Sequence, residues 1–109
     1  MSDLISDERV EKALKYLAET DLPAAQAKAR SKALEQYGKT VKAFGFLEAS
    51  GTVAERESEA LTSEQYGEYL DQYERAVQED QHYANKRTTE SGIVDVWRSE
   101  QANRRRGNI

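Results

Sequence analysis

The chain has no cysteine, a single proline, a single histidine and a single tryptophan among its 109 residues. The lack of cysteine excludes a disulfide framework, thiol catalysis and a cysteine-based zinc site. No apolar run approaches the about 20 residues of a membrane-spanning helix. The first residues also lack the basic and apolar regions of a secretory signal. We therefore expect a cytoplasmic protein that does not enter a membrane.

The composition is that of a folded chain with a small core. Apolar residues make up 38% and charged residues 33%, which is too apolar for a disordered chain. The formal net charge of −4 argues against indiscriminate binding of the whole chain to nucleic acid. At this length we expect one domain, spanning residues 1–109, with a thin core. Such a core favours a homo-oligomer or a protein partner that buries a second apolar seam.

The stretch around Gly51 predicts a helix stop followed at once by a helix start. Glycine takes the left-handed conformation after a helix end at little cost. Thr52, with Glu55 three residues later, is the pattern of a capping box. Residues 23–50 carry five basic and two acidic side chains, and residues 51–85 carry two basic and nine acidic ones. Net charges of +3 and −7 favour pairing of the two arms as an antiparallel hairpin.

The apolar spacing predicts an all-α fold of three to four helices, a long antiparallel helical hairpin with an additional N-terminal helix. Ser6 suits the N-cap of a helix over residues 6–19. A turn at 20–22 precedes a second helix over 23–49, with Pro23 in its first turn, where its missing N–H is harmless. A third helix is expected over 53–87. Residues 88–92 either break this helix or lie within it, so residues 89–105 are a fourth helix or a continuation.

Two apolar stripes are expected to face each other in the hairpin. Their spacings of three and four residues are typical of a helix–helix seam. The stripes consist of Ala27, Leu34, Tyr37, Val41, Phe44 and Leu47 or Glu48 on one arm, and of Ala60, Ser63, Tyr66, Leu70, Tyr73, Val77 and Ala84 on the other. If the chain turns near residue 50, the numbers of facing residues sum to about 100. Gly67 costs about 1 kcal/mol against alanine within a helix, and a close helix–helix contact there would explain it.

Two groups of residues are candidates for binding a protein partner. Trp97 and Arg98 belong to the residue types most frequent at interface hot spots. The alternative is that Trp97 anchors the last segment to the core. The second group comprises Tyr66, Tyr69 and Tyr73, which share one helix face. Acidic neighbours disfavour base stacking by these rings, so they form either the core stripe of the hairpin or a protein-binding groove.

A cluster of arginines near the C-terminus is the candidate for nucleic-acid binding. Arg98, Arg104, Arg105 and Arg106 could contact phosphates from one helix end. The net charge of residues 86–109 is only +3, from six basic and three acidic side chains. The cluster is therefore a weak alternative to a protein interface.

Nothing in the chain forms a recognisable catalytic or cofactor site. Glu79 and His82 have the Glu-x-x-His spacing of di-iron carboxylate bundles, but one copy supplies too few ligands. The chain also has no glycine-rich nucleotide-binding motif. We expect a non-enzymatic protein with no cofactor, no metal and no catalytic residue. The identity of the partner, the oligomeric state and any role of the acidic face stay open.

Several segments resemble small helical proteins encoded in phages and prophages of alphaproteobacteria. These are Leu4-Ile-Ser-Asp-Glu-Arg-Val, Ala13-Leu-Lys-Tyr-Leu, Phe46-Leu-Glu-Ala-Ser-Gly-Thr-Val-Ala-Glu-Arg-Glu, Val94-Asp-Val-Trp-Arg-Ser and Ala102-Asn-Arg-Arg-Arg. The resemblance covers most of the chain and consists of caps, a hairpin turn and a Trp-Arg tail. It implies an accessory protein of a phage early region, near replication or recombination genes. It carries no catalytic residue onto this sequence.

Overall fold

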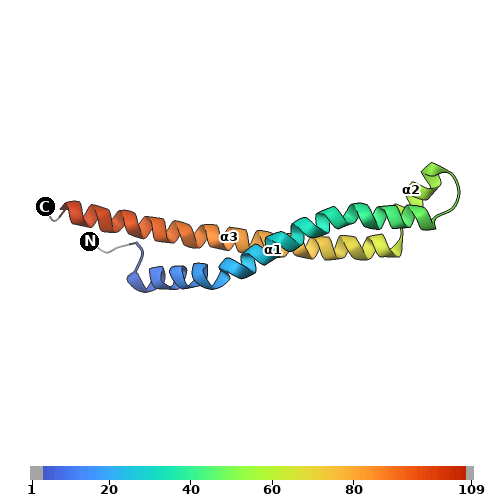
Figure 1. Cartoon of the computed structure of the whole chain (residues 1–109). Coiled ribbons are helices and arrows are strands. Elements are labelled where there is room, and N and C mark those ends of the chain that lie inside the picture. The colour runs from blue at the N-terminus through green and yellow to red at the C-terminus, as the bar shows by residue number, and fades with distance from the viewer. Residues whose placement is uncertain (1–3, 108–109) are drawn as a thin grey trace. The chain divides into compact units, whose positions relative to one another are not determined.

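A computed structural model describes residues 4–107 and contains only helices in this range (Figure 1). The elements are α1 (Asp7–Glu48), α2 (Val53–Leu61) and α3 (Glu64–Gly107). The all-α fold class and the helical hairpin are thereby confirmed. Residues 1–3, on which the expectation about a secretory signal partly rests, lie outside the described residues. No helix among residues 4–107 is both long and apolar enough to cross a membrane.

The connection at Gly51 has the structure that its sequence predicts. Gly51 has a φ of 111°, in the left-handed region that glycine tolerates. Thr52 follows as the N-cap of α2, and its hydroxyl oxygen accepts a hydrogen bond of 3.2 Å from the backbone N–H of Glu55. The end of α1 and the start of α2 are therefore both determined locally, because each depends on one residue and its immediate neighbours.

The boundary expected at residues 20–22 is not observed, because α1 is one helix of 42 residues with Pro23 inside it. Proline removes one backbone hydrogen bond and disfavours a helix interior. Side chains supply other bonds one turn earlier. Arg87 Nη1 donates to the carbonyl of Leu17 at 2.8 Å and to the hydroxyl of Thr20 at 2.6 Å. The Thr20 hydroxyl in turn donates to the carbonyl of Tyr16 at 2.6 Å. These bonds hold the turn before Pro23 in helical form.

The helix expected over residues 53–87 is instead interrupted at Thr62 and Ser63, while α3 runs without a break through residues 88–92. The Thr62 hydroxyl donates to the carbonyl of Ser58 at 2.9 Å, at the C-cap of α2. The Ser63 hydroxyl accepts from the backbone N–H of Tyr66 at 3.1 Å, as an N-cap does. Side chains of this kind compete with backbone hydrogen bonds, and here two in succession end one helix and begin the next.

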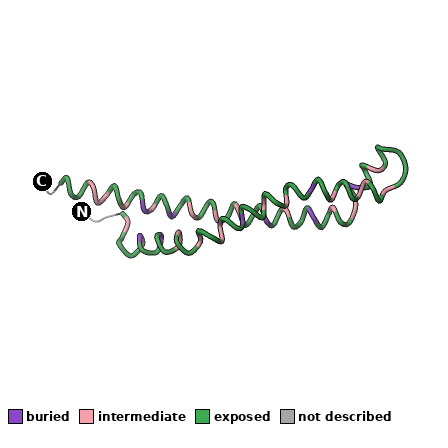
Figure 2. The backbone as a smooth tube through the Cα atoms, viewed as in Figure 1, coloured by how far each residue is buried: buried purple, intermediate pink, exposed green. Residues whose placement is uncertain are grey.

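The described chain divides into two compact units, one of which comprises residues 25–80. In this hairpin unit the second half of α1 lies antiparallel to the first part of α3 (Figure 1). The buried positions of the unit are scattered along its helices (Figure 2), and all but one tyrosine are small residues. They are Ala27, Gly38, Ala60, Tyr69 and Ala76. Small side chains let two helices approach closely, so the core of this unit is thin, as expected.

At two places along α3, the residue that faces α1 is the one directly before the expected residue. Tyr69 and Ala76 are buried, whereas Leu70 and Val77 are 46% and 40% exposed. This shift occurs because the large side chain of Tyr69 packs onto the small Gly38 of α1. The ring of Tyr69 lies over Gly38, and its hydroxyl donates to the carbonyl of Leu34 at 2.6 Å. Leu34 was expected near residues 66 and 67, so the hairpin register is also shifted.

The close helix contacts of the hairpin unit occur at two glycines of α1. A Cβ added at Gly38 would lie 2.8 Å from Cζ of Tyr69, and one at Gly45 would lie 3.0 Å from Cα of Ala60. Gly67, for which a close contact was expected, has no neighbour within 4 Å of such a Cβ. Close approach therefore explains the α1 glycines and does not explain Gly67.

The second unit comprises residues 1–24 and 81–109, of which residues 4–24 and 81–107 are described. Its apolar core consists of Val10, Ala13 and Val94. Beside them lies the buried Glu90, whose carboxylate oxygens lie 2.8 and 2.7 Å from Nη2 of Arg9. This ion pair links α1 to α3 and neutralises the one buried acid among the described residues.

Candidate protein-interaction surface

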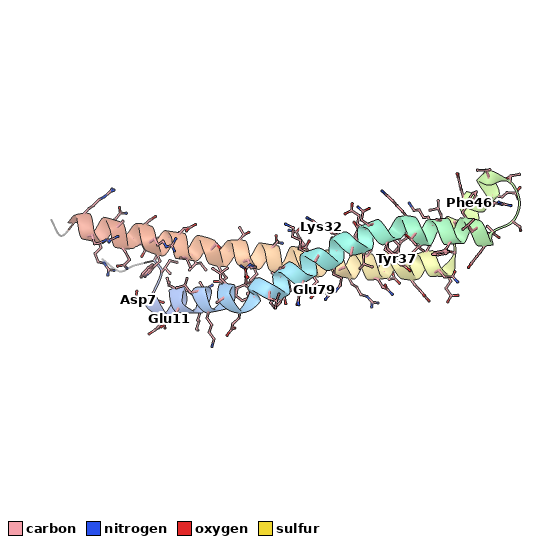
Figure 3. The ribbon with its side chains drawn as sticks, in the orientation of Figure 1. Asp7, Glu11, Lys32, Tyr37, Phe46 and Glu79 are labelled. Carbon is pink, nitrogen blue, oxygen red and sulfur yellow. The ribbon has the colours of Figure 1, made fainter. Side chains whose placement is uncertain are left out.

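Trp97 and Arg98 lie on α3 in the unit formed by the chain ends. Trp97 is half-buried, and its indole Nε1 donates at 3.0 Å to Oδ1 of Asp7, which Figure 3 labels near the start of α1. Arg98 is exposed, with Asp95 4.0 Å away on the same helix. Trp97 therefore has a contact within the chain that fits the role of an anchor between α1 and α3.

The three tyrosines lie together in the hairpin unit, as their spacing predicts. The rings of Tyr66 and Tyr73 have their centroids 5.8 and 5.9 Å from that of Tyr69. Tyr69 is only 7% exposed, and burial raises the pKa of its hydroxyl above the usual value. The Tyr37 ring meets it edge-on at 6.3 Å. Tyr66, Tyr69 and Tyr73 form a ladder between α1 and α3, in which Tyr69 is buried and Tyr66 and Tyr73 are half-buried.

The arginine cluster lies in the last turn of α3. Arg104, Arg105 and Arg106 are exposed there. Cations at a helix C-terminus interact favourably with the macrodipole. Their position is thus explained by the helix itself, and their side chains also present positive charge to solvent.

The hairpin unit has an open groove that the sequence did not reveal. It has a volume of about 490 Å³ and lies between α1 on one side and α2 and α3 on the other. Tyr37, Val41 and Phe44 line it from α1, and Gln65, Glu68 and Gln72 from α3. Tyr37, which Figure 3 labels on α1, is 53% exposed, and Phe44 is 60% exposed.

Tyr37 and Phe44 were expected in the seam and instead lie beside it. The α1 positions in the seam are Leu34, Gly38, Val41 and Gly45, all buried or half-buried; Gly45 packs against Ala60 of α2. Their spacing of four, three and four residues is that of a coiled-coil seam. The pair of glycines seven residues apart is the signal in the sequence for this face. Aromatic residues one position before each glycine are left at the rim, where they line the groove.

The charged side chains that line the groove are all acidic. Glu48, Glu59 and Glu68 line it, and none of its lining residues is lysine or arginine. Tyr37 and Phe44 take part in none of the cation–aromatic contacts among residues 4–107. Phe46, by contrast, is covered by Arg56 at 5.6 Å from its ring centroid. The groove therefore offers uncovered aromatic surface next to carboxylates.

A second hollow adjoins the groove at Gln72, which lines both. It has a volume of about 330 Å³ and contains Arg30, Arg75 and Glu79. Arg30 Nη1 binds Oε2 of Glu79 at 2.9 Å. Arg75 is exposed and has no ion pair within residues 4–107. We refer to the groove and this hollow together as the interaction strip.

The Glu79 and His82 pair does not form a metal centre in the described chain. Glu79 is engaged with Arg30, and His82 is exposed. Among residues 4–107, no group of three or more histidine, cysteine, aspartate or glutamate side chains is placed to hold a metal ion.

Comparison with protein-family models, with curated proteins and with solved structures found no match for this chain. Among residues 4–107, the interaction strip combines a concave shape, exposed aromatic side chains and an uneven charge distribution.

Proposed function

We propose that the chain is a non-enzymatic accessory protein that acts through helical protein–protein interaction, with the interaction strip as its binding surface. The observation that carries this proposal is the exposure of Tyr37 and Phe44 at a groove of about 490 Å³. Aromatic residues are enriched in the anchors of protein interfaces. The polar side chains around them suit the rim of such an interface.

The small buried core supports the same proposal. The chain exposes 8301 Å², whereas a compact monomer of its mass, 12.4 kDa, exposes about 6,100 Å². A grooved helical pair can bury more apolar surface by accepting a further helix, as amphipathic helices in grooves do. A partner on the strip would therefore add to the stability of the folded chain.

The wider setting rests on the sequence resemblance. It supports an accessory protein of the phage or prophage type that acts in the cytoplasm of a bacterial cell. Trp97 and Arg98 form a second proposed contact surface. Trp97 is half-buried and bound to Asp7, so only its exposed part is open to a partner. The Tyr66, Tyr69 and Tyr73 ladder supports the strip from within, because Tyr69 is buried beneath it.

Photocrosslinking from the groove tests the proposal. A benzoyl-phenylalanine introduced at Phe44 should give one discrete covalent adduct on irradiation in cells that produce the chain. The same probe at Gln36, an exposed α1 residue that lines neither part of the strip, should give none. If position 44 gives no adduct, or both positions give the same set of adducts, the strip is not a binding surface.

Accessory nucleic-acid binding is the second candidate, favoured by the exposed Arg98, Arg104, Arg105 and Arg106. Phosphate contacts make affinity fall steeply with salt concentration. Replacing the three terminal arginines with glutamine should flatten that dependence for a short DNA duplex, measured by fluorescence anisotropy. If the chain binds neither DNA nor RNA at low salt, this candidate is excluded.

A further inference from the structure

The interaction strip has opposite charges at its two ends. At the groove end, Glu48, Glu59 and Glu68 are the charged lining residues. At the other end Arg30 and Arg75 lie with one acid, Glu79, which Arg30 binds. Within residues 4–107, one surface thus carries carboxylates without an ion pair and one guanidinium without an ion pair, separated along the helix axis. Such a surface is complementary to an inverted copy of itself.

The spacing of charged residues along α3 suits pairing with an inverted copy of the same helix. Glu68 and Arg75 are seven residues apart, so both lie on the same face of the helix. They are separated by roughly 10 Å along the axis, at about 1.5 Å per residue. Gln72 lies between them and joins the two hollows. A two-fold axis next to Gln72 would bring Glu68 of each copy to Arg75 of the other.

Exposed aromatic side chains lie next to these charged residues. Tyr37 and Gln72 both line the groove, and Tyr37 and Phe44 are 53% and 60% exposed. A second copy that brings Glu68 to Arg75 also covers this part of the groove, where burial of aromatic side chains is favourable.

We propose that the interaction strip is a two-fold interface with a second copy of this chain, in which Glu68 of each copy pairs with Arg75 of the other. This inference rests on the proposed function and names its partner. Two-fold interfaces present the same patch on both subunits, so a surface must be complementary to itself to form one. The strip has exposed aromatic side chains and oppositely charged ends, as such an interface requires.

Charge reversal tests the pairing. The variants Glu68→Arg and Arg75→Glu each place like charges at both contacts of the dimer. Each should raise the dissociation constant of the dimer at least about tenfold, measured by sedimentation equilibrium at low salt. The chain with both substitutions restores both pairs and should return to within about threefold of the unmodified chain. An equimolar mixture of the two single variants should also dimerise, because each then supplies the charge that the other lacks.

The matched control is Asp71→Arg, which makes the same charge change on an exposed residue outside the strip. It should leave the dissociation constant unchanged, and helicity by circular dichroism should be equal in all variants. If the double variant and the mixture stay as weak as the single variants, the proposed register is wrong. If the unmodified chain is a monomer throughout, self-association is excluded. The photocrosslinking adduct at position 44 then decides the proposed function separately, because a partner of different mass supports it and no adduct overturns it.

Discussion

At the scale of single residues, Gly38 decides how α1 and α3 approach each other. Its place in the seam leaves room for the ring of Tyr69, which lies there with its hydroxyl bound to the carbonyl of Leu34 at 2.6 Å. The ring is further held by Tyr66 and Tyr73 on either side. A side chain at position 38 therefore cannot be accommodated by a simple rotation of Tyr69.

We expect Gly38→Ala to destabilise the chain and Gly67→Ala to stabilise it. Alanine gains about 1 kcal/mol over glycine within a helix at both positions. At Gly38 this gain is opposed by overpacking against Tyr69, which costs about 1–3 kcal/mol. At Gly67 nothing lies within 4 Å of the added Cβ. Urea unfolding followed by circular dichroism measures both changes. Equal stabilisation by the two substitutions would show that the seam at Gly38 is loosely packed.

At the scale of the helices, the sequence predicts what depends on neighbouring residues. Gly51 and Thr52 end one helix and begin the next through contacts within four residues, and both features were predicted. The break at Thr62 and Ser63 was not, because many helices contain such residues without ending. The continuity of α1 through Pro23 depends on Arg87, which is remote in sequence.

The candidate site was missed for a related reason. A periodic pattern treats each large apolar residue as part of the core, so Tyr37 and Phe44 were assigned to the seam. In the structure the seam passes through Gly38 and Gly45, where the helices approach closely, and Tyr37 and Phe44 lie beside it. Which of two adjacent positions faces the partner helix is decided by the partner, and a single-helix pattern does not contain that information.

The pairing of α1 with α3 through Arg9 and Glu90 should make stability depend on pH. The hydrogen bond from Arg9, followed by its charge, lowers the pKa of Glu90 below the usual value. A carboxyl group whose pKa is lower in the folded chain stabilises it above the pKa of the unfolded chain, about 4.3. That stabilisation is lost as the pH falls through the lower folded value.

Glu90→Gln should therefore lower the melting temperature most at neutral pH, and the difference from the unmodified chain should shrink toward pH 3, which is about one unit below the usual pKa of glutamate. The control is Glu19→Gln in the exposed pair with Lys15, which lies outside the strip and whose side chains are 64% and 75% exposed. Exposed pairs contribute little, so this variant should change the melting temperature less. A pH-independent difference for Glu90→Gln would mean that its charge does not contribute to folding.

At the scale of the whole molecule, the exposed surface and the charge distribution lead to the same conclusion. The exposed area of 8301 Å² leaves much apolar surface in contact with water, and a standard interface covers about 800 Å² of each partner. A dimer through the strip would cover the aromatic side chains that the helices leave open. Part of the folding free energy would then come from association.

Thermal unfolding should consequently depend on protein concentration. Association that occurs only in the folded state raises the melting temperature by mass action. Each tenfold increase in concentration adds about 1.4 kcal/mol to the stability of a dimer, which corresponds to roughly 3 °C for a pair of chains of this size. Calorimetry over about a hundredfold range of concentration should show this rise for the unmodified chain. It should be absent for Glu68→Arg at concentrations where that variant is monomeric. A melting temperature that stays constant for both would show that the seams within each chain supply all of the stability, and that the exposed aromatic side chains contribute nothing to it.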